Sequence, residues 1–105
     1  MATLNDVQTE IERQLTRDYA DRPFSEIKLM LHLGLAEEAG EVAGLMKRVL
    51  RNFPKDRIRA TKENFIEEMG DVLWYLTACC EVQGTSLEEI WTYNKQKIKE
   101  RYGNE

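Results

Sequence analysis

The chain has few of the residues that build disulfide, thiolate or imidazole sites: 2 cysteines and 1 histidine in 105 residues. Cys79 and Cys80 are adjacent, which is too few for a disulfide framework and the wrong spacing for a zinc knuckle. We therefore interpret both as reduced core residues. The lone histidine, His32, is typical of a core or pocket residue, with a substrate contact as the second interpretation.

Long apolar runs and an excess of basic residues are also missing. No run approaches the roughly 20 residues of a membrane span, and residues 1–6 lack the basic and then apolar pattern of a signal peptide. We therefore expect a cytoplasmic protein that does not bind membranes. A formal net charge of -4 argues against broad nucleic-acid binding, which needs a basic face to neutralise phosphates.

The length and composition predict one globular domain over residues 1–105. Hydrophobic residues make up 42% and charged residues 32%, which is typical of a folded domain rather than a disordered segment. Self-association would help so short a chain to bury apolar surface, so we expect a homodimer or homotetramer.

Apolar residues recur at spacings of three and four along the whole chain, and no alternating strand pattern interrupts them. The fold class is therefore predicted to be all-α. The pattern predicts helices over about residues 3–20, from a cap at Ser25 to before Asn52, over about residues 61–82, and from a cap at Ser86 to Gly103. Residues 52–60 form a polar, basic connection.

Two acidic motifs, EEAGE at residues 37–41 and EEMGD at residues 67–71, lie in the middle of predicted helices. Residues three apart share one helix face. The carboxylates with this spacing are Glu38 with Glu41, and Glu68 with Asp71. Packed face to face, two such helices would gather four carboxylates, which repel one another unless protons or cations compensate. Oxygen ligands with no histidine or thiolate beside them favour Mg²⁺ or Mn²⁺ over zinc or copper.

Two other interpretations of the motifs compete with a magnesium site. In the first, the acids form a surface stripe paired with Lys47, Arg48 and Lys62, as most helical charge runs do. Two matching motifs among core residues argue against it. In the second, the helices hold a di-iron centre, but such helices carry Glu-x-x-His pairs and neither motif has a histidine at its fourth position.

Glycines inside the predicted helices need a reason, because each costs roughly 1 kcal/mol relative to alanine. They are Gly34, Gly40, Gly44 and Gly70. We expect a neighbouring helix or a ligand to approach the backbone closely at these positions.

The last predicted helix carries a third constellation. Asn94, Lys97 and Arg101 follow at i, i+3 and i+7, so they lie along one stripe. An amide, an ammonium and a guanidinium in this arrangement suit phosphate oxygens around a metal. Basic residues near a helix C-terminus also suit the helix dipole, which is the plainer interpretation of the same stripe.

With these motifs the chain resembles the MazG-like nucleotide pyrophosphohydrolases of the all-α NTP pyrophosphatase superfamily. The resemblance covers about residues 26–103, and its segments are GLAEEAGEV at 34–42, EEMGDVLWYL at 67–76, and Tyr93-Asn94 with Lys97 and Arg101-Tyr102. It implies a four-helix bundle that forms a dimer or a dimer of dimers and binds Mg²⁺. It also implies cleavage of nucleoside triphosphates to the monophosphate and pyrophosphate, and leaves the nucleobase open.

Carried onto this chain, the resemblance implies roles for particular residues. The metal ligands would be Glu38, Glu41, Glu68 and Asp71, and the phosphate contacts would be Asn94, Lys97 and Arg101. A carboxylate would accept the proton of the attacking water, with Glu38 as the first candidate and Glu37 as the second. The candidates for a nucleobase pocket are Trp74, Tyr75 and Trp91, although aromatic residues in a helical bundle are more often part of the core.

Two non-catalytic alternatives belong to other classes of protein. A helical interaction module, of the toxin-antitoxin or phage accessory type, would present its acidic face to a basic partner without any metal. A nucleotide sensor would bind the triphosphate without turnover, although the intact acidic motifs favour an enzyme.

Overall fold

The computed structural model describes residues 1–52 and 62–103. They form four helices, namely α1 (Leu4–Tyr19), α2 (Phe24–Asn52), α3 (Lys62–Gln83) and α4 (Leu87–Tyr102). No strand occurs in these two ranges, which confirms the all-α prediction. The predicted connection lies outside the described residues except for Asn52, which ends α2. None of the four helices is long and apolar enough to cross a membrane.

The helix boundaries follow from local capping chemistry. The Thr3 hydroxyl accepts from the Asp6 amide while the Asp6 carboxylate accepts from the Thr3 amide, a capping box that starts α1. Ser86 accepts from the amide of Glu89 and starts α4, as predicted. The cap predicted at Ser25 was wrong, because α2 already begins at Phe24 and the Pro23 carbonyl accepts from the amides of Glu26 and Ile27.

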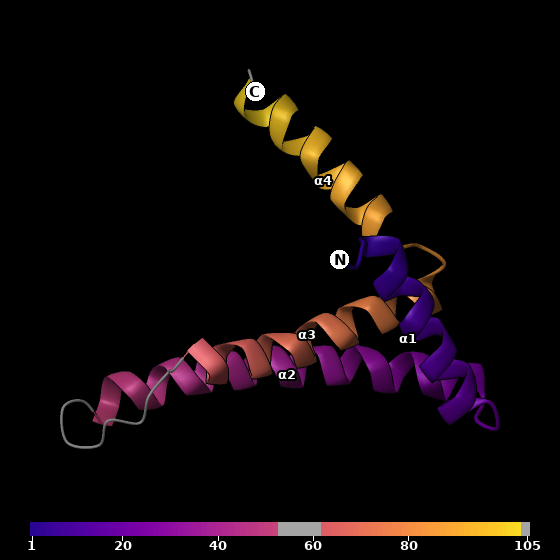
Figure 1. Cartoon of the computed structure of the whole chain (residues 1–105), viewed down its shortest axis with the longest axis horizontal. Helices are drawn as coiled ribbons and strands as arrows, with labels where there is room; N and C mark the ends of the chain where they lie inside the picture. The colour runs from indigo at the N-terminus through magenta and orange to yellow at the C-terminus, as the bar shows by residue number, and fades with distance from the viewer. Residues whose placement is uncertain (53–61, 104–105) are drawn as a thin grey trace.

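Helices α2 and α3 lie antiparallel along most of their length, as Figure 1 shows. His32 meets Gln83 near one end of the pair, and Gly34 meets Tyr75 further along. Helix α1 packs on the C-terminal half of α3, and the core forms where the three helices meet. Its buried members are Ile11, Leu31, Ala78 and Cys79, with Leu31 0% exposed.

The two cysteines behave as the sequence predicts. Cys79 and Cys80 are free and buried, and burial raises the pKa of both thiols. A raised pKa keeps the thiol protonated at neutral pH, so neither side chain is an activated nucleophile.

Helix α4 meets α1 at its first turn, and the rest of it extends away from the other three helices (Figure 1). It packs mainly on α1, through the buried Leu87 at its first turn. Most of its large apolar side chains are exposed, and they are Ile90, Trp91, Tyr93, Ile98 and Tyr102. The four helices therefore do not close into the four-helix bundle that the resemblance implied for one chain.

Glycine is required at one helical position. A Cβ at Gly34 would lie 2.1 Å from Cε1 of Tyr75, so the tyrosine ring occupies the space of the missing side chain. Nothing lies within 4 Å of a Cβ at Gly40 or Gly70, and at Gly44 only the Arg48 guanidinium comes near, at 3.4 Å. The predicted close approach is confirmed at Gly34 and is not made within one chain at Gly40 or Gly70.

Two matched glycine substitutions on α2 should change stability in opposite directions. We expect Gly34→Ala to lower the free energy of unfolding by about 1 kcal/mol or more, because displacing the packed Tyr75 ring outweighs the gain in helix propensity. Gly44→Ala meets only the end of a flexible arginine and should stabilise by about 0.5–1 kcal/mol. Urea denaturation measures both values, and a stabilised Gly34→Ala protein would contradict the packing described here.

Candidate metal centre

Three carboxylates from the two acidic motifs converge across the contact between α2 and α3. Glu38 from α2 and Glu68 and Asp71 from α3 each place an oxygen within 4.8 Å of the other two. Glu38 and Glu68 are half-buried and Asp71 is exposed. The predicted meeting of the motifs is thus present for three of the four carboxylates. We call Glu38, Glu68 and Asp71 the acidic group.

Repulsion within the acidic group is visible at Glu38. Burial raises the pKa of this carboxyl above its ordinary value, and the negative charges of Asp71, Glu37, Glu41 and Glu68 raise it further. Like charges at this separation oppose ionisation unless a cation lies between them. The group is therefore electrostatically suited to a cation.

Basic side chains do not neutralise the motifs. The ion pairs that the described residues form are Arg13 with Glu10, Arg17 with Asp18, and Arg22 with Glu26. In the described ranges, none of them includes a residue of either motif. The surface-stripe interpretation required pairing with Lys47, Arg48 and Lys62, and that pairing is not found.

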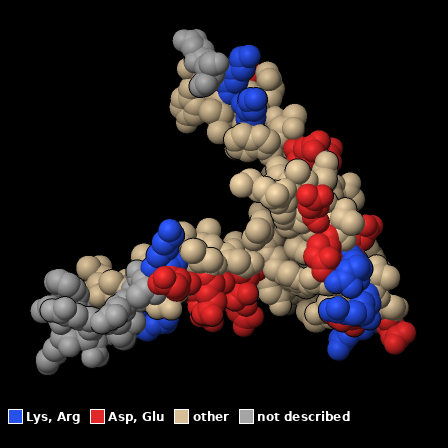
Figure 2. Space-filling model, viewed as in Figure 1, with Lys and Arg blue, Asp and Glu red and all other residues tan. Residues whose placement is uncertain are grey.

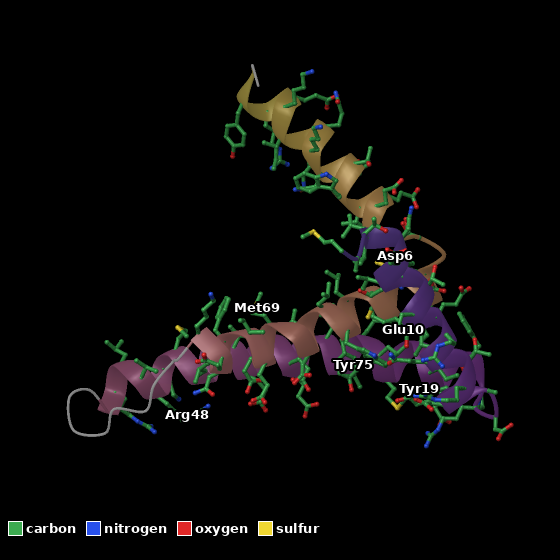
Figure 3. All side chains as sticks on the ribbon, in the orientation of Figure 1. Asp6, Glu10, Tyr19, Arg48, Met69 and Tyr75 are labelled. Atoms are coloured by element: carbon green, nitrogen blue, oxygen red, sulfur yellow. The ribbon has the colours of Figure 1, made fainter. Side chains whose placement is uncertain are left out.

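Two further acids border the group. Glu41 is exposed one turn after Glu38 on α2, outside the three converging oxygens, yet its charge contributes to the raised pKa of Glu38. Glu37 is exposed and lies at the edge of a neighbouring groove. In Figure 3, Met69 lies on the opposite edge of α3 from the oxygen-tipped side chains of the paired helices.

An apolar groove of about 500 Å³ adjoins the acidic group. Its lining residues are Glu26, Leu29, Met30, Leu33, Gly34, Glu37 and Tyr75. Burial raises the pKa of the Tyr75 hydroxyl, and among the charges that raise it further are those of Glu38, Glu37 and Asp71. The groove thus runs along α2, and its residues Gly34 and Tyr75 lie one helix turn from Glu38 and Asp71. We call it the Tyr75 groove.

Of the three sequence candidates for the nucleobase pocket, Tyr75 lines this groove and Trp74 lies elsewhere. Its Nε1 donates to Oε1 of Gln14 on α1 at 2.8 Å, and it lines a separate groove between α1 and α3. The rings of Tyr75 and Trp74 pack edge to face with their centroids 5.0 Å apart, but the Tyr75 ring lies against α2 at Gly34. The sequence spacing already contains a signal for Tyr75 as an aromatic residue beside the carboxylates. Tyr75 follows Asp71 by four residues and Glu68 by seven, and therefore shares their helix face.

His32 is held between α2 and α3. Its Nδ1 lies 2.7 Å from the Lys28 carbonyl oxygen and its Nε2 lies 3.1 Å from Nε2 of Gln83. A carbonyl oxygen only accepts, so Nδ1 carries the proton and Nε2 accepts from the glutamine. Nδ1 is thus engaged within α2, and Nε2 makes the contact that joins α2 to α3.

The proposed phosphate-binding residues do not reach the acidic group within one chain. Asn94 and Lys97 line a groove of about 380 Å³ on α4, and Arg101 lies one turn further along the same helix. Figure 2 shows basic side chains near the end of α4, well separated from the acidic side chains over α2 and α3. The two halves of the predicted site therefore lie on different parts of the protomer.

Comparison with known proteins points to one family. The model of the MazG nucleotide pyrophosphohydrolase domain matches residues 26–104. The uncharacterized protein YvdC of Bacillus subtilis (strain 168) is 31% identical over 99 residues, which cover 89% of this chain and 93% of YvdC. The Gene 37 protein of Mycobacterium phage L5 is 29% identical over 69 residues, 66% of this chain and 60% of that protein. No solved structure matches the chain.

Metal binding should appear as a rise in melting temperature. A ligand that binds only the folded chain at about 100 times its Kd stabilises it by about 2.7 kcal/mol, so we expect Mg²⁺ to raise the Tm by several degrees. Glu38→Gln should melt higher than the unaltered chain without metal, because it removes a repelling charge, and should lose most of the response to Mg²⁺. Differential scanning calorimetry measures both effects.

The control for this measurement is Glu63→Gln on α3, which removes an exposed acid outside the motifs. It should keep the full response to Mg²⁺. A Glu38→Gln protein that responds to Mg²⁺ as strongly as this control would remove Glu38 from the metal site.

Proposed function

Because the chain belongs to the MazG nucleotide pyrophosphohydrolase family, we propose that it hydrolyses nucleoside triphosphates to the monophosphate and pyrophosphate with Mg²⁺ as cofactor. One observation carries the proposal. Three carboxylates from two separate helices converge without a basic partner, and no requirement of folding explains so costly an arrangement. Mn²⁺ suits the same oxygen ligands and is the expected substitute.

The residues proposed to hold the cation are the acidic group together with Glu41. Three oxygens within 4.8 Å of one another fit a small cation that favours oxygen ligands. Glu41 lies one turn along α2 on the face of Glu38, where a rotamer change would bring its carboxylate to the group. When bound, Mg²⁺ neutralises the triphosphate and polarises the phosphorus that is attacked.

The protein's own contribution to the reaction is to take a proton and to orient the phosphates. Water adds to phosphorus, the bond to the bridging oxygen breaks to release pyrophosphate, and a carboxylate receives the proton of the water. Glu38 is the first candidate for this base because it lies among the converging carboxylates, and Glu37, exposed beside it on α2, is the alternative. Phosphoryl transfer needs positioning and charge stabilisation rather than a covalent nucleophile.

We assign the nucleoside to the Tyr75 groove. It comes within one helix turn of the acidic group, so a triphosphate bound at the carboxylates would direct its nucleoside along α2. Leu29, Leu33 and the Tyr75 ring give the groove apolar walls against which a base can lie. His32, the other substrate candidate, is engaged in holding α2 to α3 and acts on the groove only through that contact.

The second half of the site is proposed to come from another copy of the chain. Helix α4 extends away from its own acidic group and exposes large side chains, with Tyr93 74% and Tyr102 77% exposed. Pairing two copies would bury this apolar surface. It would also bring the stripe of Asn94, Lys97 and Arg101 to the acidic group of the other chain. A homodimer, or a homotetramer built from two such pairs, then forms complete sites.

Pyrophosphate release tests the proposed activity directly. We expect release from some members of a panel of canonical and modified nucleoside triphosphates with Mg²⁺ or Mn²⁺, and none with chelator. Glu41→Gln should abolish turnover with the helical circular dichroism unchanged, whereas Lys97→Ala should raise KM at least tenfold and leave the Mg²⁺ response of the Tm intact.

Pyrophosphate release, triphosphate binding and the Mg²⁺ response of the Tm together separate the alternatives. A sensor would bind triphosphates without releasing pyrophosphate, and an interaction module would neither bind them nor respond to metal. Full turnover in the Glu41→Gln protein would defeat the assignment of that residue.

A further inference from the structure

Gln8 of α1 joins the end of α3 to the start of α4 with one side chain. Its Nε2 donates to Oε1 of Glu81 at 2.6 Å, and its Oε1 accepts from the backbone amide of Leu87 at 3.0 Å. Both hydrogen bonds are partly buried. The amide of Gln8 therefore fixes the last turn of one helix and the first residue of the next.

The chain between these helices supplies little restraint of its own. It turns through Gly84, whose φ of 73° is favourable only for glycine, and the Thr85 amide donates back to the Cys80 carbonyl. The first amides of a helix have no partner inside the helix. Ser86 accepts from the amide of Glu89, whereas the amide of Leu87 donates to Oε1 of Gln8 on α1.

Beyond this junction α4 has few contacts to hold its direction. Leu87 is its buried residue, and the bond from Asn5 to Glu88 is exposed and so competes with water. Lys97 lies ten residues further on, about 15 Å along the helix at 1.5 Å per residue. A tilt of about 10° at Leu87 would thus move Lys97 by about 2.6 Å. Displacements of about 1 Å at a phosphate-binding group are enough to impair a reaction strongly.

We propose that Gln8 is a positioning residue, which sets the direction of α4 and thereby places Asn94 and Lys97 at the acidic group of a second copy. The inference rests on the proposed function, which places α4 at the acidic group of a second copy. The two hydrogen bonds of Gln8 are the evidence for how the direction of α4 is set. Gln8 touches neither substrate nor metal in this account. Its effect therefore appears in triphosphate binding and is absent from the affinity for the cation.

An exchange of the two side chains tests the geometry. Gln8→Glu keeps an acceptor for the Leu87 amide but sets a carboxylate against that of Glu81, so the first hydrogen bond is lost. Adding Glu81→Gln restores it with donor and acceptor exchanged, because the amide at position 81 then donates to the carboxylate at position 8. Glu81→Gln alone retains both bonds, because Gln8 still donates to its amide oxygen. Thr9→Glu, at an exposed neighbouring position, controls for the added charge.

The expected result is a KM for the triphosphate at least tenfold higher in Gln8→Glu, with the Mg²⁺ response of the Tm unchanged. The double variant should return the KM to within about threefold of the unaltered chain, and Glu81→Gln and Thr9→Glu should stay near it throughout. An unchanged KM in Gln8→Glu, or a double variant no better than Gln8→Glu, would overturn the inference.

A distance measurement separates this inference from the proposed function. Spin labels on α1 and α4, at Glu12→Cys and Lys99→Cys, should give one narrow distance in the unaltered background and a broad distribution in Gln8→Glu that narrows again in the double variant. If the unaltered chain releases no pyrophosphate, the proposed function fails, and these distances alone then decide whether Gln8 sets the direction of α4. The same distribution in all backgrounds would then overturn the role of Gln8.

Discussion

The antiparallel contact between α2 and α3 determines where every other group of the site lies. Its register is set where Leu31 is fully buried and the Tyr75 ring occupies the space left by Gly34. Further along the same pair, this register places Glu38 opposite Glu68 and Asp71. Because side chains on one helix face are separated by whole turns, a change of register would separate the carboxylates and move the Tyr75 groove away from them.

The acidic group makes the folded chain less stable than it would be without these charges. Burial and neighbouring carboxylates raise the pKa of Glu38, and no basic side chain in the described ranges forms an ion pair with either motif. The basic residues suited to phosphate lie instead on α4, which its own chain holds away from the group. Because the basic residues of α4 lie far from the acidic group in the protomer, the group is free to bind a cation. In our proposal, the pairing of two chains brings α4 of one chain to the acidic group of the other.

Much of the local structure could be predicted from the sequence, because helical periodicity and capping act over a few residues. The four helices followed from periodicity and the cap at Ser86 from its residue type. The meeting of Glu38 with Glu68 and Asp71 followed from the spacing of the acids only on the assumption that the two helices pack face to face. The direction of α4 could not, since it depends on hydrogen bonds from Gln8, 79 residues before Leu87. The sequence does not separate Trp74 from Tyr75 as a nucleobase contact because both follow Asp71 closely, and only the packing of α1 shows that Trp74 donates to Gln14.

Subunit complementation tests the central claim most directly, namely that the acidic group of one chain works with α4 of another. Asp71→Asn and Lys97→Ala chains are assayed for pyrophosphate release alone and after joint refolding, at a triphosphate concentration well below the KM of the Lys97→Ala chain. Random pairing makes about half of the dimers mixed, each with one intact site, so the mixture should recover about a quarter of the unaltered activity. If Lys97 served its own chain, mixed dimers would hold no intact site, and the mixture would show only the mean of the two variants, which would contradict the account.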